Sequence, residues 1–175
     1  NAMGAADGSE SNNVAIGYGT LATMDADGSN YNVAVGYNAG TAVTTGIQNT
    51  IMGGLAGDAL TTGSYNIAIG YKALSTEDSG SGNVAIGREA LQNANTGNTA
   101  YNVAIGYQAG KLVSSGLRHV FIGGNAGDAV TTGNDNVAIG YSAFSTEDTG
   151  NKNTALGAYA LQDLNYDGDG HNTAI

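Results

Sequence analysis

The residues best suited to chemistry in this chain are carboxylates and amides gathered in two short loops. A D-x-N-x-D-G spacing begins at Asp163 and would place hard oxygen ligands around Ca²⁺. Ala174 stands where an EF-hand has its glutamate, which excludes an EF-hand, and turn formation by Asp, Asn and Gly accounts for the same residues. Calcium is therefore the one candidate metal, and no other cofactor is predicted. The candidate ligands are Asp25, Asp27, Asp163, Asn165, Asp167 and Asp169.

Catalytic groups are scarce in the sequence. The chain has two His and no Cys, and no carboxylate pair has an identifiable base beside it, so neither a nucleophilic triad nor a metal hydrolase can be assembled. The run from Ile69 to Leu74 resembles a hexapeptide repeat of left-handed helix acyltransferases. That fold needs three such hexads per coil, and here there is one. The sequence predicts a protein that is not an enzyme, with the acyltransferase as an alternative.

The loops belong to a repeat that sets the architecture. The phrase Asn-Val-Ala-Ile-Gly, or a near copy, occurs ten times, and successive copies lie 17 or 19 residues apart. Each step predicts one rung of a β-solenoid, with the phrase as a short strand that ends at a glycine. We therefore predict an all-β parallel β-roll of about nine rungs. The copies begin at Asn13, Asn32, Asn49, Asn66, Asn83, Asn102, His119, Asn136, Asn153 and Asn172.

A longer period of 70 residues is also visible. Residues 32–87 recur with few changes as 102–157, which indicates that a block of four rungs was duplicated. We assign residues 1–12 to a tag remnant and lead-in, and 13–175 to one repeat domain made of 13–82, 83–152 and a partial 153–175. We expect the chain to be a segment of a longer protein, because it stops inside a repeat.

Both faces of the predicted strand are apolar, which predicts that both are buried. We expect Val14 and Ile16 and their equivalents to fill the rung, and the small residue between them to face a neighbouring chain. A rung of 17 to 19 residues encloses little space, so this second face requires association into an obligate oligomer. The predicted interface consists of Ala15, Ala34, Ile51, Ala68, Ala85, Ala104, Phe121, Ala138 and Ala155.

The leading Asn of each phrase is predicted to stand at a corner and to form a hydrogen-bonded ladder with its neighbours. His119 occupies that position once, and we expect it to act as a hydrogen-bonding substitute for Asn, with a functional histidine as the alternative. Fourteen places after the leading Asn, glycine recurs from Gly46 to Gly150, and we expect positive φ angles at these corners.

The Asn-x-Ala-Ile-Gly-x-x-Ala repeat resembles the head repeat of trimeric autotransporter adhesins and the repeat stalks of phage tail fibres. The resemblance covers residues 13–175. It implies a left-handed β-roll, a side-by-side homotrimer, and an extracellular location on an outer-membrane-anchored bacterial surface or a virion tail fibre. The rungs of this chain are longer than those of adhesin heads, so a bacterial and a phage origin both stay open.

The function that follows is attachment to a host-surface protein or glycan, with a passive fibre spacer as the alternative. A net charge of −10 opposes nucleic acid and anionic membranes as partners, and no apolar run is long enough to insert into a bilayer. Ice binding is a further alternative, because Thr pairs such as Thr44-Thr45 and Thr61-Thr62 share a column. That column is interrupted after two rungs. Exposed tyrosines could form a strip that holds sugars or protein.

Overall fold

The computed structural model describes residues 2–4, 10–146, 148–164 and 169–175, and within them it contains strands, turns and bends. This part of the chain has no helix of the length and hydropathy needed to cross a bilayer. The described strands are β1 (Glu10–Ser11), β2 (Val14–Ile16), β3 (Gly28–Ser29), β4 (Val33–Val35), β5 (Thr50–Met52), β6 (Ile67–Ile69), β7 (Val84–Ile86), β8 (Val103–Ile105), β9 (Val120–Ile122), β10 (Val137–Ile139), β11 (Thr154–Leu156) and β12 (Thr173–Ala174).

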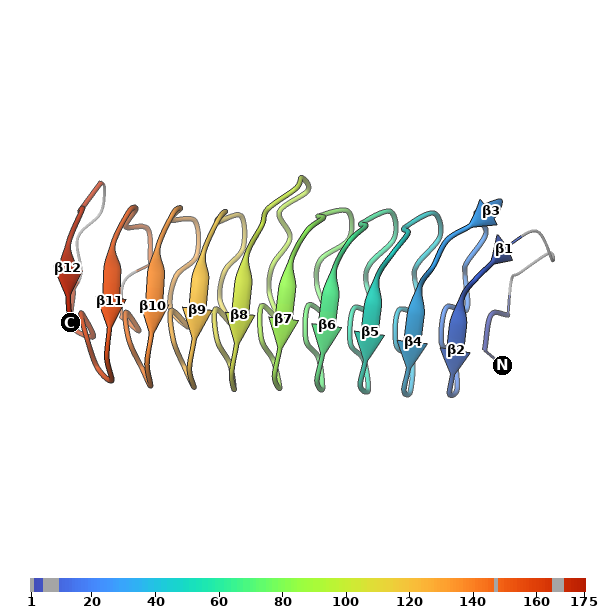
Figure 1. Ribbon diagram of the computed structural model, residues 1–175, viewed down its shortest axis with the longest axis horizontal. Helices are drawn as coiled ribbons and strands as arrows, with labels where there is room; N and C mark the ends of the chain where they lie inside the picture. Colours follow the sequence, from blue (N-terminus) through green and yellow to red (C-terminus); the bar gives the residue numbers. More distant parts are fainter. Residues whose placement is uncertain (1, 5–9, 147, 165–168) are drawn as a thin grey trace.

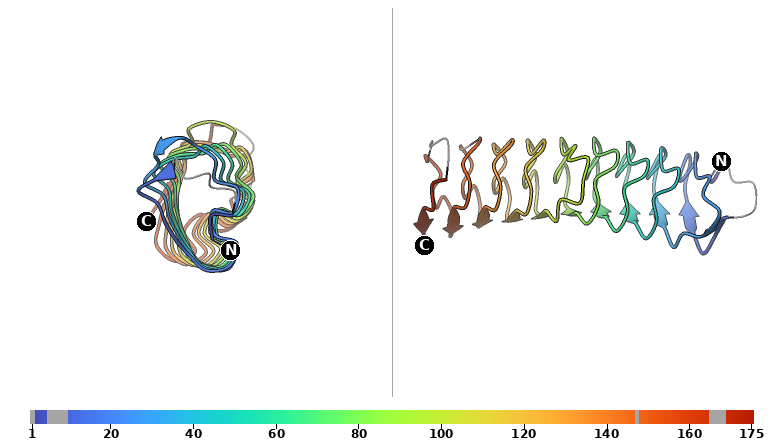
Figure 2. Two further views of the ribbon diagram at one scale, coloured as in Figure 1. Left: turned by 90° about the vertical axis from the view of Figure 1, so that its right-hand side faces the viewer. Right: turned by 90° about the horizontal axis from the view of Figure 1, so that it is seen from above.

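The strands stack into one long parallel sheet. Ten of the described strands follow each other in the order β12-β11-β10-β9-β8-β7-β6-β5-β4-β2. The pairing keeps the repeated phrase in register, since Val33 pairs with Thr50 and Thr50 with Ile67. Figure 1 shows the strands side by side along the long axis, with the termini at opposite ends, and Figure 2 shows the rungs superposed around one outline. The prediction of an all-β parallel solenoid of about nine rungs is confirmed.

Each phrase ends in glycine because the chain turns sharply there and successive rungs come close together. The glycines after the strands have φ between +125° (Gly157) and +141° (Gly36 and Gly106), a region that L side chains rarely adopt. A Cβ atom on Gly70 would also lie 2.5 Å from the carbonyl oxygen of Gly87. The backbone geometry thus requires glycine at this position.

The narrow interior is lined by the middle residue of each strand. From the second rung to the ninth, these are the residues predicted to touch a neighbouring chain, and all of them are completely buried inside their own rungs: Ala34, Ile51, Ala68, Ala85, Ala104, Phe121, Ala138 and Ala155. Ala15 of the first rung is partly buried and packs against the same core. The predicted interface is therefore wrong. A rung this small has room for alanine inside and leaves the longer Val and Ile side chains outside.

Two rungs hold a large middle residue, and the opposite wall compensates for it with glycine. A Cβ atom on Gly127 would lie 2.6 Å from the ring of Phe121, and one on Gly57 would lie 3.5 Å from Ile51. Where the middle residue is alanine, as in β10, the equivalent position on the opposite wall can hold a buried Phe144. The two positions share a fixed interior volume, because close-packed cores tolerate neither voids nor overlap.

The alanine that stands seven places after the leading Asn or His of a rung, from Ala39 to Ala143, also faces inward and is buried. It lies in a turn.

The three 19-residue rungs use their extra residues to form one more contact with the preceding rung. In the first, β1 pairs with β3 in parallel. The equivalent residues in the next two form isolated bridges, Ser81 with Thr99 and Asn151 with Asp169. Figure 1 shows the loop between β7 and β8 rising above its neighbours. Because Met3 also donates its backbone N–H to the Thr20 carbonyl oxygen, the described lead-in residues extend the stack.

Candidate binding surfaces

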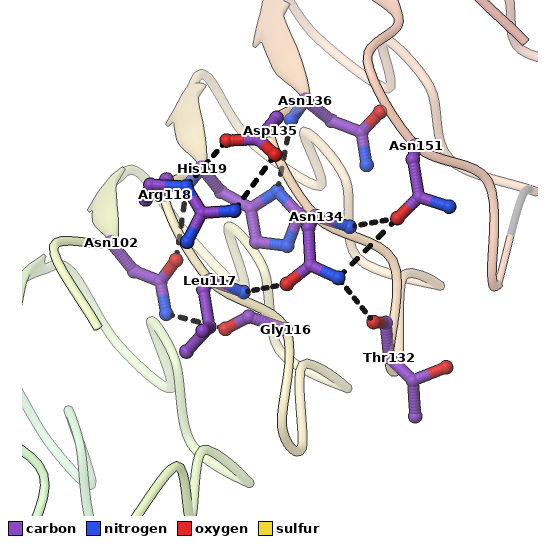
Figure 3. A network of polar contacts seen from close by, with 10 residues as sticks. All are labelled: Asn102, Gly116, Leu117, Arg118, His119, Thr132, Asn134, Asp135, Asn136 and Asn151. Carbon is purple, nitrogen blue, oxygen red and sulfur yellow. Dashed lines mark hydrogen bonds and ion pairs between the residues drawn. The ribbon is translucent and has the colours of Figure 1, made fainter. Parts of the chain in front are cut away.

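A ladder of side-chain hydrogen bonds runs along one corner of the solenoid. The backbone N–H of each ladder residue donates to the side chain of the ladder residue one rung earlier, at distances of 2.9 to 3.3 Å, from Asn32 to Asn172. Figure 3 shows one stretch of it, from Asn102 through His119 to Asn136. All ten residues named from the sequence as ladder positions are joined in this series.

The glycines fourteen places on complete the ladder. The side-chain amide of Asn49, for example, donates to the Gly63 carbonyl oxygen at 2.9 Å. The expected positive φ occurs in this column at Gly97 among the described residues. At the other positions the reason for glycine is close approach between rungs, since a Cβ atom on Gly46 would lie 2.3 Å from the Gly63 carbonyl oxygen.

His119 replaces asparagine in the ladder and is completely buried. Its Nδ1 accepts the backbone N–H of Asn136 at 3.3 Å, while its Nε2 reaches no hydrogen-bond partner among the described residues. The ring stacks on Phe121 with 4.6 Å between centroids. Burial lowers the pKa of His119 to about 4, outweighing the opposing effects of the Gly133 carbonyl and of Asp135. A neutral imidazole is the form that can accept this hydrogen bond.

The outward side of the sheet is an apolar surface, which we call the outer strand face. It consists of the first and third residues of the strands, which are partly or fully exposed in the isolated chain. Ile16 is 60% exposed, Met52 41% and Ile139 37%. The surface runs the length of the stack, about 43 Å for nine rungs of ~4.8 Å. Its members are Val14, Ile16, Val33, Val35, Thr50, Met52, Ile67, Ile69, Val84, Ile86, Val103, Ile105, Val120, Ile122, Val137, Ile139, Thr154 and Leu156.

Tyrosines border the outer strand face on both sides. One flank carries Tyr31, Tyr65 and Tyr101 immediately before the ladder residue, and all are exposed. The other flank follows the phrase glycine and includes stacked Tyr18 and Tyr37 rings, 5.7 Å apart. The exposed tyrosines of this second flank are Tyr18, Tyr37, Tyr71, Tyr107 and Tyr141.

Charged side chains lie between the tyrosines of the second flank. The Arg88 guanidinium lies 5.9 Å from the ring centroids of both Tyr71 and Tyr107. Beside it, Glu89 is nearly buried and accepts a hydrogen bond from Lys111 Nζ at 2.8 Å. Hydrogen bonds from Lys111, then Gln108 and Arg88, lower the pKa of Glu89 to about 2. The negative charge of this carboxylate is therefore balanced by Lys111 and Arg88, and the group is not free to bind a ligand.

The role of Glu77 was not identified from the sequence. Glu77 is completely buried. It accepts hydrogen bonds from the backbone N–H of Gly80 at 2.7 Å and from the N–H and hydroxyl of Thr96 at 3.0 and 2.9 Å. The carboxylate thus fixes the long loop of the next rung. The change from the apolar residues at the same place in other rungs, such as Val43 and Leu60, was the available signal.

The predicted calcium ligands do not gather in the described part of the chain. Asp25, Asp27 and Asp163 are exposed, and Asp169 forms an ion pair with Lys152 at 2.6 Å. Asn165 and Asp167 lie outside the described residues. No group of three or more His, Cys, Asp or Glu side chains in residues 2–4, 10–146, 148–164 and 169–175 has the arrangement of a metal site.

No pocket is found among the described residues, and the candidate surfaces described above are exposed ones. Those surfaces are the outer strand face and the two tyrosine flanks. Compared with known proteins, the chain matches no family model, no curated sequence and no solved structure.

Proposed function

We propose that this chain is a non-enzymatic segment of an extracellular attachment fibre, on a bacterial or virion surface, built from three identical chains. The repeat's resemblance to trimeric adhesin heads and phage fibres motivates the assignment, together with its implied left-handed roll. Three parallel rods would present each outer loop three times, and multivalency would then strengthen weak individual contacts.

The observation that carries the proposal is the outer strand face. A straight, continuous apolar surface of this length is uncommon on a monomeric protein and marks a site of association. Because the strands are parallel and in register, three chains set side by side about an axis would meet rung for rung. In this proposal the chains associate through the Val and Ile columns rather than through the alanines.

Light scattering on the purified protein at micromolar concentration tests this directly. We expect a mass of three 17.4 kDa chains for the native sequence. Ile69→Glu combined with Ile105→Glu puts two charges into the middle of the face, and we expect dissociation because unpaired charges are costly to bury. Leu112→Glu is the matched control, since Leu112 is 43% exposed and lies in a turn outside the strands. A stable, folded single chain of the native sequence would contradict the proposal.

A further inference from the structure

Three tyrosines on the first flank form a regular row, which we call the tyrosine row: Tyr31, Tyr65 and Tyr101. They are 54%, 58% and 64% exposed. They stand two residues before paired strand positions in β4, β6 and β8, so one ring occurs every second rung in the same register. With ~4.8 Å between rungs, the rings repeat every ~9.6 Å along the fibre axis.

The row is held in place by the backbone. The N–H of Tyr65 donates to the Ile47 carbonyl oxygen at 3.0 Å, and the N–H of Gly82 donates to Ser64 at 3.1 Å. The three tyrosines have φ between +54° and +61°. Gly82 in the same column shows that the fold accepts glycine there. The same positive φ occurs where the column holds other residues, such as Gln48 (+57°) and Arg118 (+58°), so the backbone sets the conformation of this column whatever the side chain.

The intervening residues leave the rings accessible. Gly82 lets the Tyr101 ring lean over it, because a Cβ atom at position 82 would lie 3.2 Å from a ring carbon. Gln48, between Tyr31 and Tyr65, is exposed and offers an amide that can donate and accept hydrogen bonds. The row therefore alternates a flat apolar surface with small or polar positions.

The duplicated half of the chain shows that this pattern is not imposed by the solenoid. Asp135 takes the place of Tyr65 seventy residues on, and it forms an ion pair with Arg118 at 2.6 Å. Lys152 takes the place of Gly82. The equivalent position is therefore aromatic at Tyr65 and charged at Asp135, while the backbone repeats.

From this geometry we infer that the tyrosine row binds a neutral, extended β-1,4-linked polysaccharide lying along the fibre axis. In such a polymer the same sugar face recurs every disaccharide, a length close to two rungs. The apolar C–H faces of the sugars would pack on successive rings, and their hydroxyl groups would bond to Tyr hydroxyls and Gln48. A neutral polymer also avoids repulsion from a chain of net charge −10. The inference rests on the proposed attachment function and specifies its ligand.

Calorimetric titration with cellohexaose and cellobiose tests the inference. We expect the native protein to bind cellohexaose, and cellobiose more weakly because it covers one ring spacing. Each exchange Tyr31→Ala, Tyr65→Ala or Tyr101→Ala should weaken cellohexaose binding by about 2- to 13-fold, the effect of losing one aromatic contact. Tyr65→Phe should retain most of the affinity. Tyr159→Ala is the control, because Tyr159 is 55% exposed outside the row.

Circular dichroism and light scattering on every variant separate the outcomes. Absence of cellohexaose binding by the native protein, or unchanged binding by a variant that combines Tyr31→Ala, Tyr65→Ala and Tyr101→Ala, overturns the inference while leaving the trimer proposal standing. Row variants that dissociate the oligomer would also overturn it, since the tyrosines would then be contacts between chains. Tighter binding of heparin than of cellohexaose would assign the surface to anionic polymers and refute the neutral ligand.

Discussion

The pH dependence of stability provides a quantitative test of the ladder, through His119. The exchange His119→Asn together with Phe121→Ile recreates the pair that the first block uses, Asn49 and Ile51. Both residues must change, because the His119 ring stacks on Phe121 and its loss alone would leave the phenyl ring without that contact. The double variant keeps the ladder and removes the buried imidazole.

The expected size follows from the pKa of His119. Folding lowers that pKa from 6.5 to about 4, so the unfolded chain takes up a proton at a pH where the folded chain does not. Stability is therefore fully present above pH 6.5 and falls as the pH drops toward 4. Between pH 7 and pH 5 the loss amounts to about 2 kcal/mol per chain, and to about 3 kcal/mol once both states are protonated.

Urea unfolding of the native protein and the double variant at pH 7 and pH 5 measures this loss. Burial raises the pKa values of Asp58 and Asp128 and so gives an opposite trend, but both proteins share it and it cancels in the comparison. His171→Asn, at an exposed position, is the control for the loss of a surface histidine. Equal losses in the native protein and the double variant would refute a neutral, buried His119.

Two further predictions concern packing between and within rungs. Gly63→Ala should lower the free energy of unfolding by about 1–3 kcal/mol, because the added Cβ would lie 2.4 Å from the Gly80 carbonyl oxygen. Gly54→Ala is the control: its added Cβ would lie 3.7 Å from the nearest atom and should change the free energy of unfolding by less than about 0.5 kcal/mol, and equal effects of the two variants in urea unfolding would contradict this reason for glycine. Phe144→Ala should cost about 3–5 kcal/mol and Phe144→Leu less than about 1.5 kcal/mol, since Leu74 fills the equivalent place one block earlier; a tolerated alanine in the same assay would show that this interior is not close-packed.

The spacing of the repeated phrase was enough to predict the stack, because identical strands at fixed intervals pair in register. It was not enough to orient the strand. Val-Ala-Ile is apolar on both sides, so alternation alone cannot tell the inside from the outside. A better signal was that large and small residues alternate between two positions of the same rung. A large middle strand residue, Ile51, occurs with Gly57, and a small one, Ala68, occurs with Leu74. Such compensation places both columns in one interior.

The candidate surfaces were predictable to different extents. The ladder followed from the leading Asn, since an amide can donate and accept at once. The burial of Glu77 was not predictable from composition, because a carboxylate in a loop is usually solvated. The regular spacing of Tyr31, Tyr65 and Tyr101 is visible in the sequence. Their role as a surface row could be inferred only once the structure showed that these side chains are exposed.

Hydrogen bonds between rungs lie along the long axis of the molecule, which has a mechanical consequence. Tension applied at the two ends would load these bonds in series, and the weakest end rung would peel away first. Each rung of 17 residues that peels would release a strand of roughly 56–61 Å in place of ~4.8 Å of folded length. Under tension, a fibre built in this way would lengthen in steps, one per unfolded rung, and would dissipate energy at each step before its attachment at the far end broke.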